Sequence, residues 1–148
     1  MPKNILIFAD GTGLIGGVRP DQQVCNIYKL FRASRVGPDS PIDPREQVAY
    51  YEPGLGTSNA AGNVRLGLGE RLKSWAGLAV GLGFSTNVID CYEAILKRYE
   101  PGDRIYLFGF SRGGYTVRAL ANVLDLCGVP ATDGKGGALP RAGRALRA

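Results

Sequence analysis

The sequence predicts an α/β protein in which helices cover both faces of a mostly parallel sheet. Two apolar runs, residues 4–9 and 105–108, lack the alternation of a half-exposed strand, so they suit parallel strands that are buried on both faces. Segments with the helical spacing of apolar residues separate these runs along the chain. Because 148 residues suffice for one sizeable core, we expect a single three-layer α/β/α unit.

The first part of the chain predicts a strand, a helix and a second strand. Residues 4–9 form the first strand, and the loop that follows them is rich in glycine. Asp21 is suited to cap a helix over residues 22–34, where apolar residues recur at helical spacing. A proline-containing loop then leads to a short strand over residues 47–51.

The middle of the chain holds eight glycines between Gly54 and Gly83, too many for an uninterrupted helix. We expect a short helix within residues 66–80, in a loop that packs its apolar residues against the core. The alternative is a cap over the active site, in which Trp75 and residues 77–84 offer apolar surface to a lipid or acyl group, with contact to a membrane surface.

The last part predicts a helix, a strand and a helix. Ser85 or Thr86 is expected to cap the helix that precedes the run at 105–108. The final helical pattern begins at Arg112 and stops before Gly128. Beyond it the chain has no periodicity, so we expect a folded domain over residues 1–130 and an unstructured basic tail over residues 131–148.

Charge and hydropathy narrow the classes of function. The net charge is +5, but residues 133–148 carry four basic residues against one acidic, which leaves 14 basic and 12 acidic residues in the body. Because the excess lies mostly in the tail, the folded body is not predicted to attract nucleic acid. No signal region is evident, and the longest uncharged apolar run, residues 75–84, is too short to span a bilayer. We expect a cytoplasmic location, with signal-independent secretion as the alternative.

Cysteine and histidine usage argues against a metal site. Cys25, Cys91 and Cys127 are widely spaced within apolar helical patterns, which is typical of reduced core residues. The sequence contains no histidine and no Cys-x-x-Cys pair, so we expect no metal ligands and no cofactor.

A G-x-S-x-G pentapeptide, Gly109-Phe110-Ser111-Arg112-Gly113, joins the strand at 105–108 to the last helix. This context is typical of a nucleophile elbow, in which a sharp strand-to-helix turn holds the serine strained between small neighbours. Gly109 and Gly113 supply the space, and the helix that begins at Arg112 directs backbone N–H groups toward a developing oxyanion. Ser111 is therefore the candidate nucleophile.

A second motif follows the first strand. The segment Gly11-Thr12-Gly13-Leu14-Ile15-Gly16 has the G-x-G-x-x-G spacing of a dinucleotide site. In such a site a helix begins within the glycines and a strand with an acidic end follows about 20 residues later. Here residues 16–20 continue as loop, and the next segment has helical spacing instead. We therefore favour a glycine-rich loop at the carboxyl end of a strand, where α/β proteins place their ligands.

Five segments together resemble the serine-hydrolase catalytic domain of the type VI secretion phospholipase effectors and their uncharacterised α/β-hydrolase relatives. The resemblance covers residues 4 to about 127, in the order found in the family. The segments are Phe8-Ala9-Asp10-Gly11-Thr12, Asn26-Ile27-Tyr28-Lys29-Leu30, Tyr50-Tyr51-Glu52-Pro53-Gly54-Leu55-Gly56-Thr57, Tyr99-Glu100-Pro101-Gly102-Asp103, and Gly109 through Leu120.

The resemblance implies an α/β-hydrolase-like fold, here incomplete, that hydrolyses lipids or other esters through an acyl-enzyme on Ser111. It also implies that the loop of Asp10, Gly11 and Thr12 lies beside the elbow and lends a backbone donor to an oxyanion hole, next to the N–H of Arg112. Asp10 would support the site from within this loop.

The other two members of a catalytic triad are missing from these residues. In α/β-hydrolases the acid and the histidine follow the serine along the chain, whereas here 37 residues follow Ser111 and none is histidine. Without a general base the serine hydroxyl is a weak nucleophile. We therefore expect the N-terminal part of a serine hydrolase that is inactive as it stands. A non-catalytic binding module on the same scaffold is the alternative, and a dinucleotide-binding domain is the third.

Overall fold

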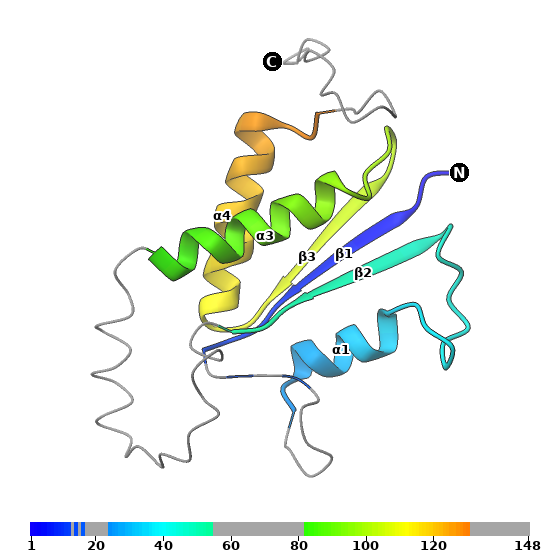
Figure 1. Cartoon of the computed structure of the whole chain (residues 1–148), viewed down its shortest axis with the longest axis horizontal. Coiled ribbons are helices and arrows are strands. Elements are labelled where there is room, and N and C mark those ends of the chain that lie inside the picture. Colours follow the sequence, from blue (N-terminus) through cyan, green and yellow to red (C-terminus); the bar gives the residue numbers. More distant parts are fainter. Residues whose placement is uncertain (13, 15, 17–23, 55–81, 131–148) are drawn as a thin grey trace.

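A computed structural model describes residues 1–12, 14, 16, 24–54 and 82–130, which form a parallel sheet between two helical layers (Figure 1). The described strands lie in the order β2-β1-β3, and all neighbours are parallel. The predicted three-layer α/β architecture is therefore confirmed. The strands are β1 (Asn4–Ala9), β2 (Gln47–Glu52) and β3 (Arg104–Gly109), and the helices are α1 (Asn26–Ser34), α3 (Leu82–Leu96) and α4 (Arg112–Cys127).

Strand β1 is the centre of the sheet because its residues are apolar on both faces. Ile5 pairs with Val48 of β2 on one side and with Ile105 of β3 on the other, and every residue from Ile5 to Ala9 is buried. The continuous apolar run in the sequence thus indicates the position of the strand as well as its existence.

The side chains of β1 alternate between two cores, one on each face of the sheet. Ile5 and Ile7 point to the face covered by α3 and α4, which appear together on one side of the sheet in Figure 1. Leu6 and Phe8 point to the face covered by α1, where Phe8 stacks on Phe108 with ring centroids 4.8 Å apart. The residues that α3 and α4 bury against the first core include Val88, Cys91, Ala94, Ile95 and Leu120.

The topology creates a crevice at the carboxyl ends of β1 and β3. The chain passes from β1 to β2 through α1 on one face, whereas α4, which follows β3, lies on the opposite face. The loops that leave the adjacent strands β1 and β3 therefore diverge. Open α/β sheets bind their ligands at such a divergence, outside the carboxyl ends of the strands.

The strands and the last helix lie where the sequence predicts them. β1 spans residues 4–9, β2 extends one residue beyond its predicted end, and α4 begins at Arg112. The short helix expected within residues 66–80, the alternative cap over residues 77–84 and the tail at 131–148 fall wholly or mostly outside the described residues, and these expectations stay predictions.

Two helices begin elsewhere than predicted. α1 begins at Asn26, because the preceding Cys25 has an extended backbone and its sulfur accepts a hydrogen bond from the Tyr28 amide, as an N-cap does. Conversely, α3 begins at Leu82, so the predicted caps Ser85 and Thr86 lie inside the helix. The early turns of α3 are held by packing, since Asn87 and Val88 are buried and the Asn87 amide donates to the Pro53 carbonyl at 3.4 Å.

The cysteines differ in their surroundings. Cys91 is fully buried, as predicted, and Cys25 is partly buried, but Cys127 is exposed, so its assignment to the core is wrong. Cys127 is the last residue of α4, beyond the turns that pack on the sheet.

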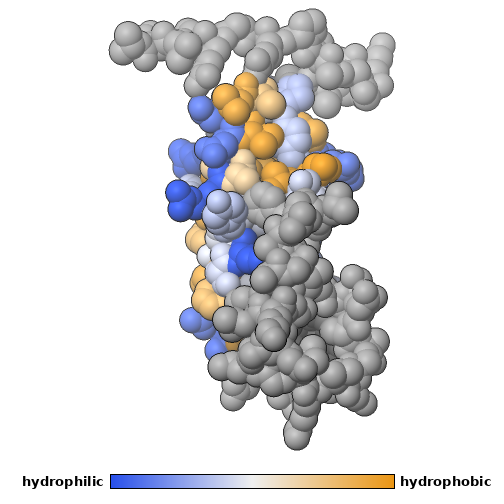
Figure 2. Space-filling model, turned by 90° about the vertical axis from the view of Figure 1, so that its left-hand side faces the viewer, coloured by the Kyte–Doolittle hydropathy of each residue, from blue (hydrophilic) through white to orange (hydrophobic). Residues whose placement is uncertain are grey.

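Apolar surface remains on the outside of the helical layer. Figure 2 shows apolar residues interleaved with polar ones on the face that looks left in Figure 1. Exposed large apolar side chains of α3 and α4 include Ile89, Tyr115 and Leu126. No helix among the described residues is both long and apolar enough to span a membrane.

Candidate functional site

Ser111 occupies the strained position of the strand-to-helix turn. Its backbone has φ 53° and ψ −121°, and it is the one non-glycine residue with positive φ in the described part of the chain. Such conformations cost about 1–3 kcal/mol and persist only where the surrounding structure imposes them. The side chain is exposed and makes no capping hydrogen bond to α4, so the hydroxyl is presented at the crevice.

Two glycines allow the backbone around Ser111 to pack closely. A Cβ at Gly109 would lie 2.5 Å from the Gly113 carbonyl oxygen, and a Cβ at Gly113 would overlap the carbonyl oxygen of Ala9 at the end of β1. The Phe110 amide also donates to the Ala9 carbonyl at 3.1 Å. Gly109 and Gly113 therefore bring the elbow, residues 109–113, directly against the end of the central strand.

The β1 loop, residues 10–12, lies beside the elbow. A Cβ built at Gly11 would lie 3.3 Å from the Ser111 Cβ and 3.1 Å from Cδ1 of Phe110. The Asp10 amide donates to the Glu52 carbonyl at 3.0 Å, which continues the pairing of β1 with β2 into the loop. The backbone of this loop is thus next to the candidate nucleophile.

The donors of the β1 loop are not equivalent. The Gly11 amide donates to Oδ1 of Asp10 at 2.8 Å and so already has an acceptor. The hydroxyl oxygen of Thr12 is buried, and neither this oxygen nor the Thr12 amide has a hydrogen-bond partner among the described residues. Arg112 provides the first amide of α4, and burial lowers the pKa of its guanidinium. Gly11 and Thr12 were both predicted to donate to an oxyanion. The amide of Gly11 is already bonded to Asp10, whereas the amide of Thr12 has no partner among the described residues.

Asp10 has partners that the sequence pattern does not reveal. Its buried carboxylate accepts hydrogen bonds from the thiol of Cys25 and the hydroxyl of Tyr51. The sequence predicts Cys25 to be a core residue and places Tyr51 in a strand. Neither prediction indicates a hydrogen bond to Asp10. In the sequence, only its place in the family-like segment Tyr50 to Thr57 singles out Tyr51.

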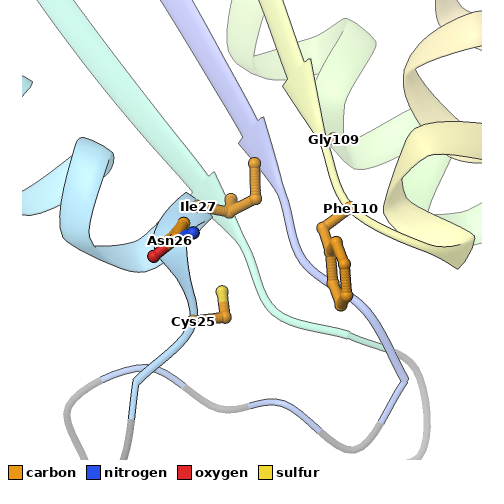
Figure 3. Close-up of a pocket in the computed structure, with 5 residues that line it drawn as sticks. All are labelled: Cys25, Asn26, Ile27, Gly109 and Phe110. Atoms are coloured by element: carbon orange, nitrogen blue, oxygen red, sulfur yellow. The ribbon is translucent and has the colours of Figure 1, made fainter.

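A pocket opens between the start of α1 and the end of β3 (Figure 3). Its volume is about 320 Å³, and two residues of the elbow, Gly109 and Phe110, form part of its wall. Figure 3 shows the Phe110 ring on one side and the α1 residues on the other. The lining is mostly apolar and consists of Cys25, Asn26, Ile27, Gly109 and Phe110.

The geometry counts against a dinucleotide site. Residues 11, 12, 14 and 16, the described part of the glycine motif, are not helical, and α1 begins only at Asn26. β2 does end in an acidic residue, Glu52, but its side chain is buried and accepts a 2.8 Å hydrogen bond from the Tyr50 hydroxyl. Burial raises the pKa of Glu52, although the Tyr50 hydrogen bond opposes this. In the described part of the chain, no three His, Cys, Asp or Glu side chains gather in a metal-binding cluster.

These features define a parallel α/β protein whose candidate site is a strained serine at the carboxyl edge of the sheet. The chain belongs to the family described as T6SS, Phospholipase effector Tle1-like, catalytic domain, whose model matches residues 3–146. The family expected from the five sequence segments is thereby confirmed.

One relative is a much longer protein. A protein of Saccharomyces cerevisiae, described as uncharacterized, is 32% identical over 130 residues, which are 86% of this chain and 18% of the relative. The chain therefore spans less than a fifth of the length of that relative. No solved structure matches the chain.

Proposed function

We propose that this domain hydrolyses ester bonds of lipids through an acyl-enzyme formed on Ser111. The observation that carries the proposal is the strained backbone of Ser111, with φ 53° and ψ −121°, at the turn from β3 to α4. A serine held in this way presents its hydroxyl above the sheet edge, as the nucleophile of a serine hydrolase requires. Membership of a family of phospholipase effector catalytic domains supports a lipid ester as the substrate class.

The proposed reaction places the new negative charge beside the β1 loop. The Ser111 hydroxyl oxygen attacks the ester carbonyl, the bond to the alcohol breaks, and water later releases the acyl group. The carbonyl oxygen becomes an oxyanion in both steps, and backbone N–H groups stabilise it best when they are fixed in advance. We assign this role to the amides of Thr12 and Arg112, and not to Gly11, whose amide donates to Asp10.

The pocket beside Phe110 suits the acyl part of such a substrate. It is mostly apolar, it holds about 320 Å³, and it opens next to the residue that precedes Ser111. An ester bound with its carbonyl at Ser111 would direct a chain of several carbons between Phe110 and Ile27. Because lipid substrates lie in membranes, we include contact of this domain with a membrane surface in the proposal.

A general base has to come from outside these residues if it is an imidazole, because the 148 residues contain no histidine. Among the described residues, no acidic or basic side chain is hydrogen-bonded to the Ser111 hydroxyl. We therefore propose that these residues alone supply the nucleophile and the oxyanion donors but turn over esters poorly.

Labelling with a fluorophosphonate tests the nucleophile, and hydrolysis assays test competence. We expect slow covalent labelling of Ser111, mapped by peptide mass spectrometry, and none in Ser111→Ala. Ser40→Ala, which removes a serine from the loop before β2, is the matched control and should leave labelling unchanged. Absence of labelling in the parent chain would favour a non-catalytic binding module on this scaffold.

Competence is measured separately with p-nitrophenyl butyrate and phospholipid vesicles. We expect turnover close to the background rate. Rapid turnover by the parent chain that disappears in Ser111→Ala would contradict the claim that the base lies elsewhere.

A further inference from the structure

The carboxylate of Asp10 is the centre of a buried polar cluster at the carboxyl end of the sheet. Asp10 is 4% exposed, and it accepts hydrogen bonds from the Cys25 thiol (2.9 and 2.8 Å to its two oxygens), the Tyr51 hydroxyl (2.8 Å) and the Gly11 amide (2.8 Å). These donors belong to the start of α1, to β2 and to the β1 loop. One carboxylate therefore ties three separate segments together.

Tyr51 connects this polar cluster to Gly16 in the glycine-rich segment after β1. Its hydroxyl group donates to Asp10, and the hydroxyl oxygen accepts from the Gly16 amide at 3.0 Å. The ring is fixed between Phe31 and Tyr28, each with a centroid 5.2 Å away. Burial, reinforced by the hydrogen bond to Asp10, raises the pKa of Tyr51, so the phenol stays protonated and donates at neutral pH.

Cys25 behaves in the same way as Tyr51. Burial and then the hydrogen bond to Asp10 raise the pKa of its thiol. A protonated thiol can donate a hydrogen bond, so Cys25 donates to the carboxylate of Asp10. The carboxylate thus has donors on both oxygens and a single orientation.

This cluster determines which donors of the β1 loop are left for a ligand at Ser111. The Gly11 amide is taken by Asp10, while the buried hydroxyl oxygen of Thr12 has no partner among the described residues. Gly11 itself lies against Ser111, so any shift of the cluster moves the loop relative to the nucleophile. A displacement of about 1 Å in a catalytic group can cost about 100-fold in rate.

We infer that Asp10 and Tyr51 are positioning residues that hold the β1 loop so that Thr12 faces the oxyanion formed at Ser111. The inference rests on the proposed function, because an oxyanion forms there only if Ser111 attacks an ester. Neither residue needs to touch the substrate, since both act through the backbone of the loop.

The Ser111→Cys variant of the 148-residue chain tests this without a general base, because a thiol supplies its own thiolate near pH 8. The thiolate attacks p-nitrophenyl butyrate, an oxyanion forms, and p-nitrophenolate leaves to give a thioester. Iodoacetamide alkylates the same thiolate by displacing iodide, and no oxyanion forms. The ratio of the acylation rate to the alkylation rate, measured at this position by mass spectrometry, therefore reports oxyanion stabilisation apart from thiol reactivity.

We expect the ratio at position 111 to exceed the ratio at the exposed Cys127 of the same molecule. Adding Tyr51→Phe removes only the phenol oxygen and should lower the ratio at position 111 about tenfold, with the alkylation rate changed by less than about twofold. Asp10→Asn, the second variant, should also lower the ratio.

Tyr50→Phe is the matched control. It removes an equally short hydrogen bond, 2.8 Å, between a neighbouring tyrosine and the buried carboxylate of Glu52 on the opposite face of β2. It should leave the ratio unchanged, even though it also costs stability.

Three results would overturn the inference. If Tyr51→Phe and Asp10→Asn keep the ratio of the parent, the cluster does not position the donor, while the proposed function stands. If Tyr51→Phe lowers acylation and alkylation equally, its role is structural only. If the parent shows no higher ratio at position 111 than at Cys127, the oxyanion hole of the proposed function is wrong, and the role of Tyr51 with it.

Discussion

Gly54 packs directly against the carbonyl group of Gly11. A Cβ at Gly54 would overlap the Gly11 oxygen and lie 3.0 Å from the Thr12 nitrogen, and the Gly54 amide donates to the Leu14 carbonyl at 3.1 Å. The end of the β2 segment therefore packs against the backbone of the β1 loop. A side chain of any size at Gly54 would have to displace that loop.

Gly54→Ala is expected to destabilise the fold by about 1–3 kcal/mol, because the contacting atoms are backbone and cannot rotate away. The midpoint of urea unfolding measures the loss. Gly114→Ala is the control, since the nearest backbone atom to a Cβ there is 3.7 Å away and alanine favours helix. We expect Gly114→Ala to raise the midpoint, and a similar loss in both variants would contradict the steric argument.

Ser111→Gly is expected to be more stable than Ser111→Ala by about 1 kcal/mol, because glycine adopts positive φ without strain and alanine does not. Both variants lose the hydroxyl, so the comparison isolates the backbone. Thermal unfolding of the two variants measures the difference. Equal melting temperatures would show that the backbone at Ser111 stores no strain.

Elements that depend on residues close together in the chain could be predicted from the sequence. The apolar run of β1 and the glycines around Ser111 are such signals, and they locate the central strand and the turn into α4. The start of α3 was not predicted, and the contact found in its early part, a 3.4 Å hydrogen bond from the Asn87 amide to the Pro53 carbonyl, joins segments that are far apart in the sequence.

The hydrogen bonds within the candidate site could not be predicted from sequence patterns either. The hydrogen bond between Asp10 and Tyr51 joins residues 41 positions apart, and neither residue has a local reason to require the other. The thiol of Cys25 caps α1 and binds Asp10, whereas its spacing in the sequence is that of an ordinary core residue. Only the folded backbone shows that the Gly11 amide is occupied.

Asp103→Asn is expected to lower stability by about 1–3 kcal/mol at pH 7, since the carboxylate accepts from the amides of Lys3 and Glu100 and pairs with the Lys3 ammonium at 2.7 Å. Burial alone would raise the pKa of Asp103, but these donors hold it below its usual value. The stabilisation is therefore present above the unfolded-state pKa of about 4 and is lost as pH falls through the folded-state pKa.

Urea unfolding at pH 7 and at pH 3 measures this effect. The difference between Asp103→Asn and the parent should shrink at the lower pH. Asp43→Asn is the control, because Asp43 pairs with an exposed arginine, Arg45, and solvent screens the pair, so the midpoint should change much less at both pH values. A constant difference for Asp103→Asn at all pH values would show that its carboxylate is not held charged by its donors.

Glu52→Gln is expected to have the opposite pH dependence. Burial raises the pKa of Glu52, so the folded state binds a proton more tightly than the unfolded state, and stability falls as pH rises from the unfolded-state pKa through the folded-state pKa. The amide of glutamine carries no charge and still offers an oxygen to the Tyr50 hydroxyl, which donates to Glu52 at 2.8 Å. Glu52→Gln should therefore unfold at a higher urea concentration than the parent at pH 8 and at a similar concentration at pH 4. A variant less stable than the parent at pH 8 would mean that the ionised carboxylate is stabilised in the folded state and that burial does not dominate.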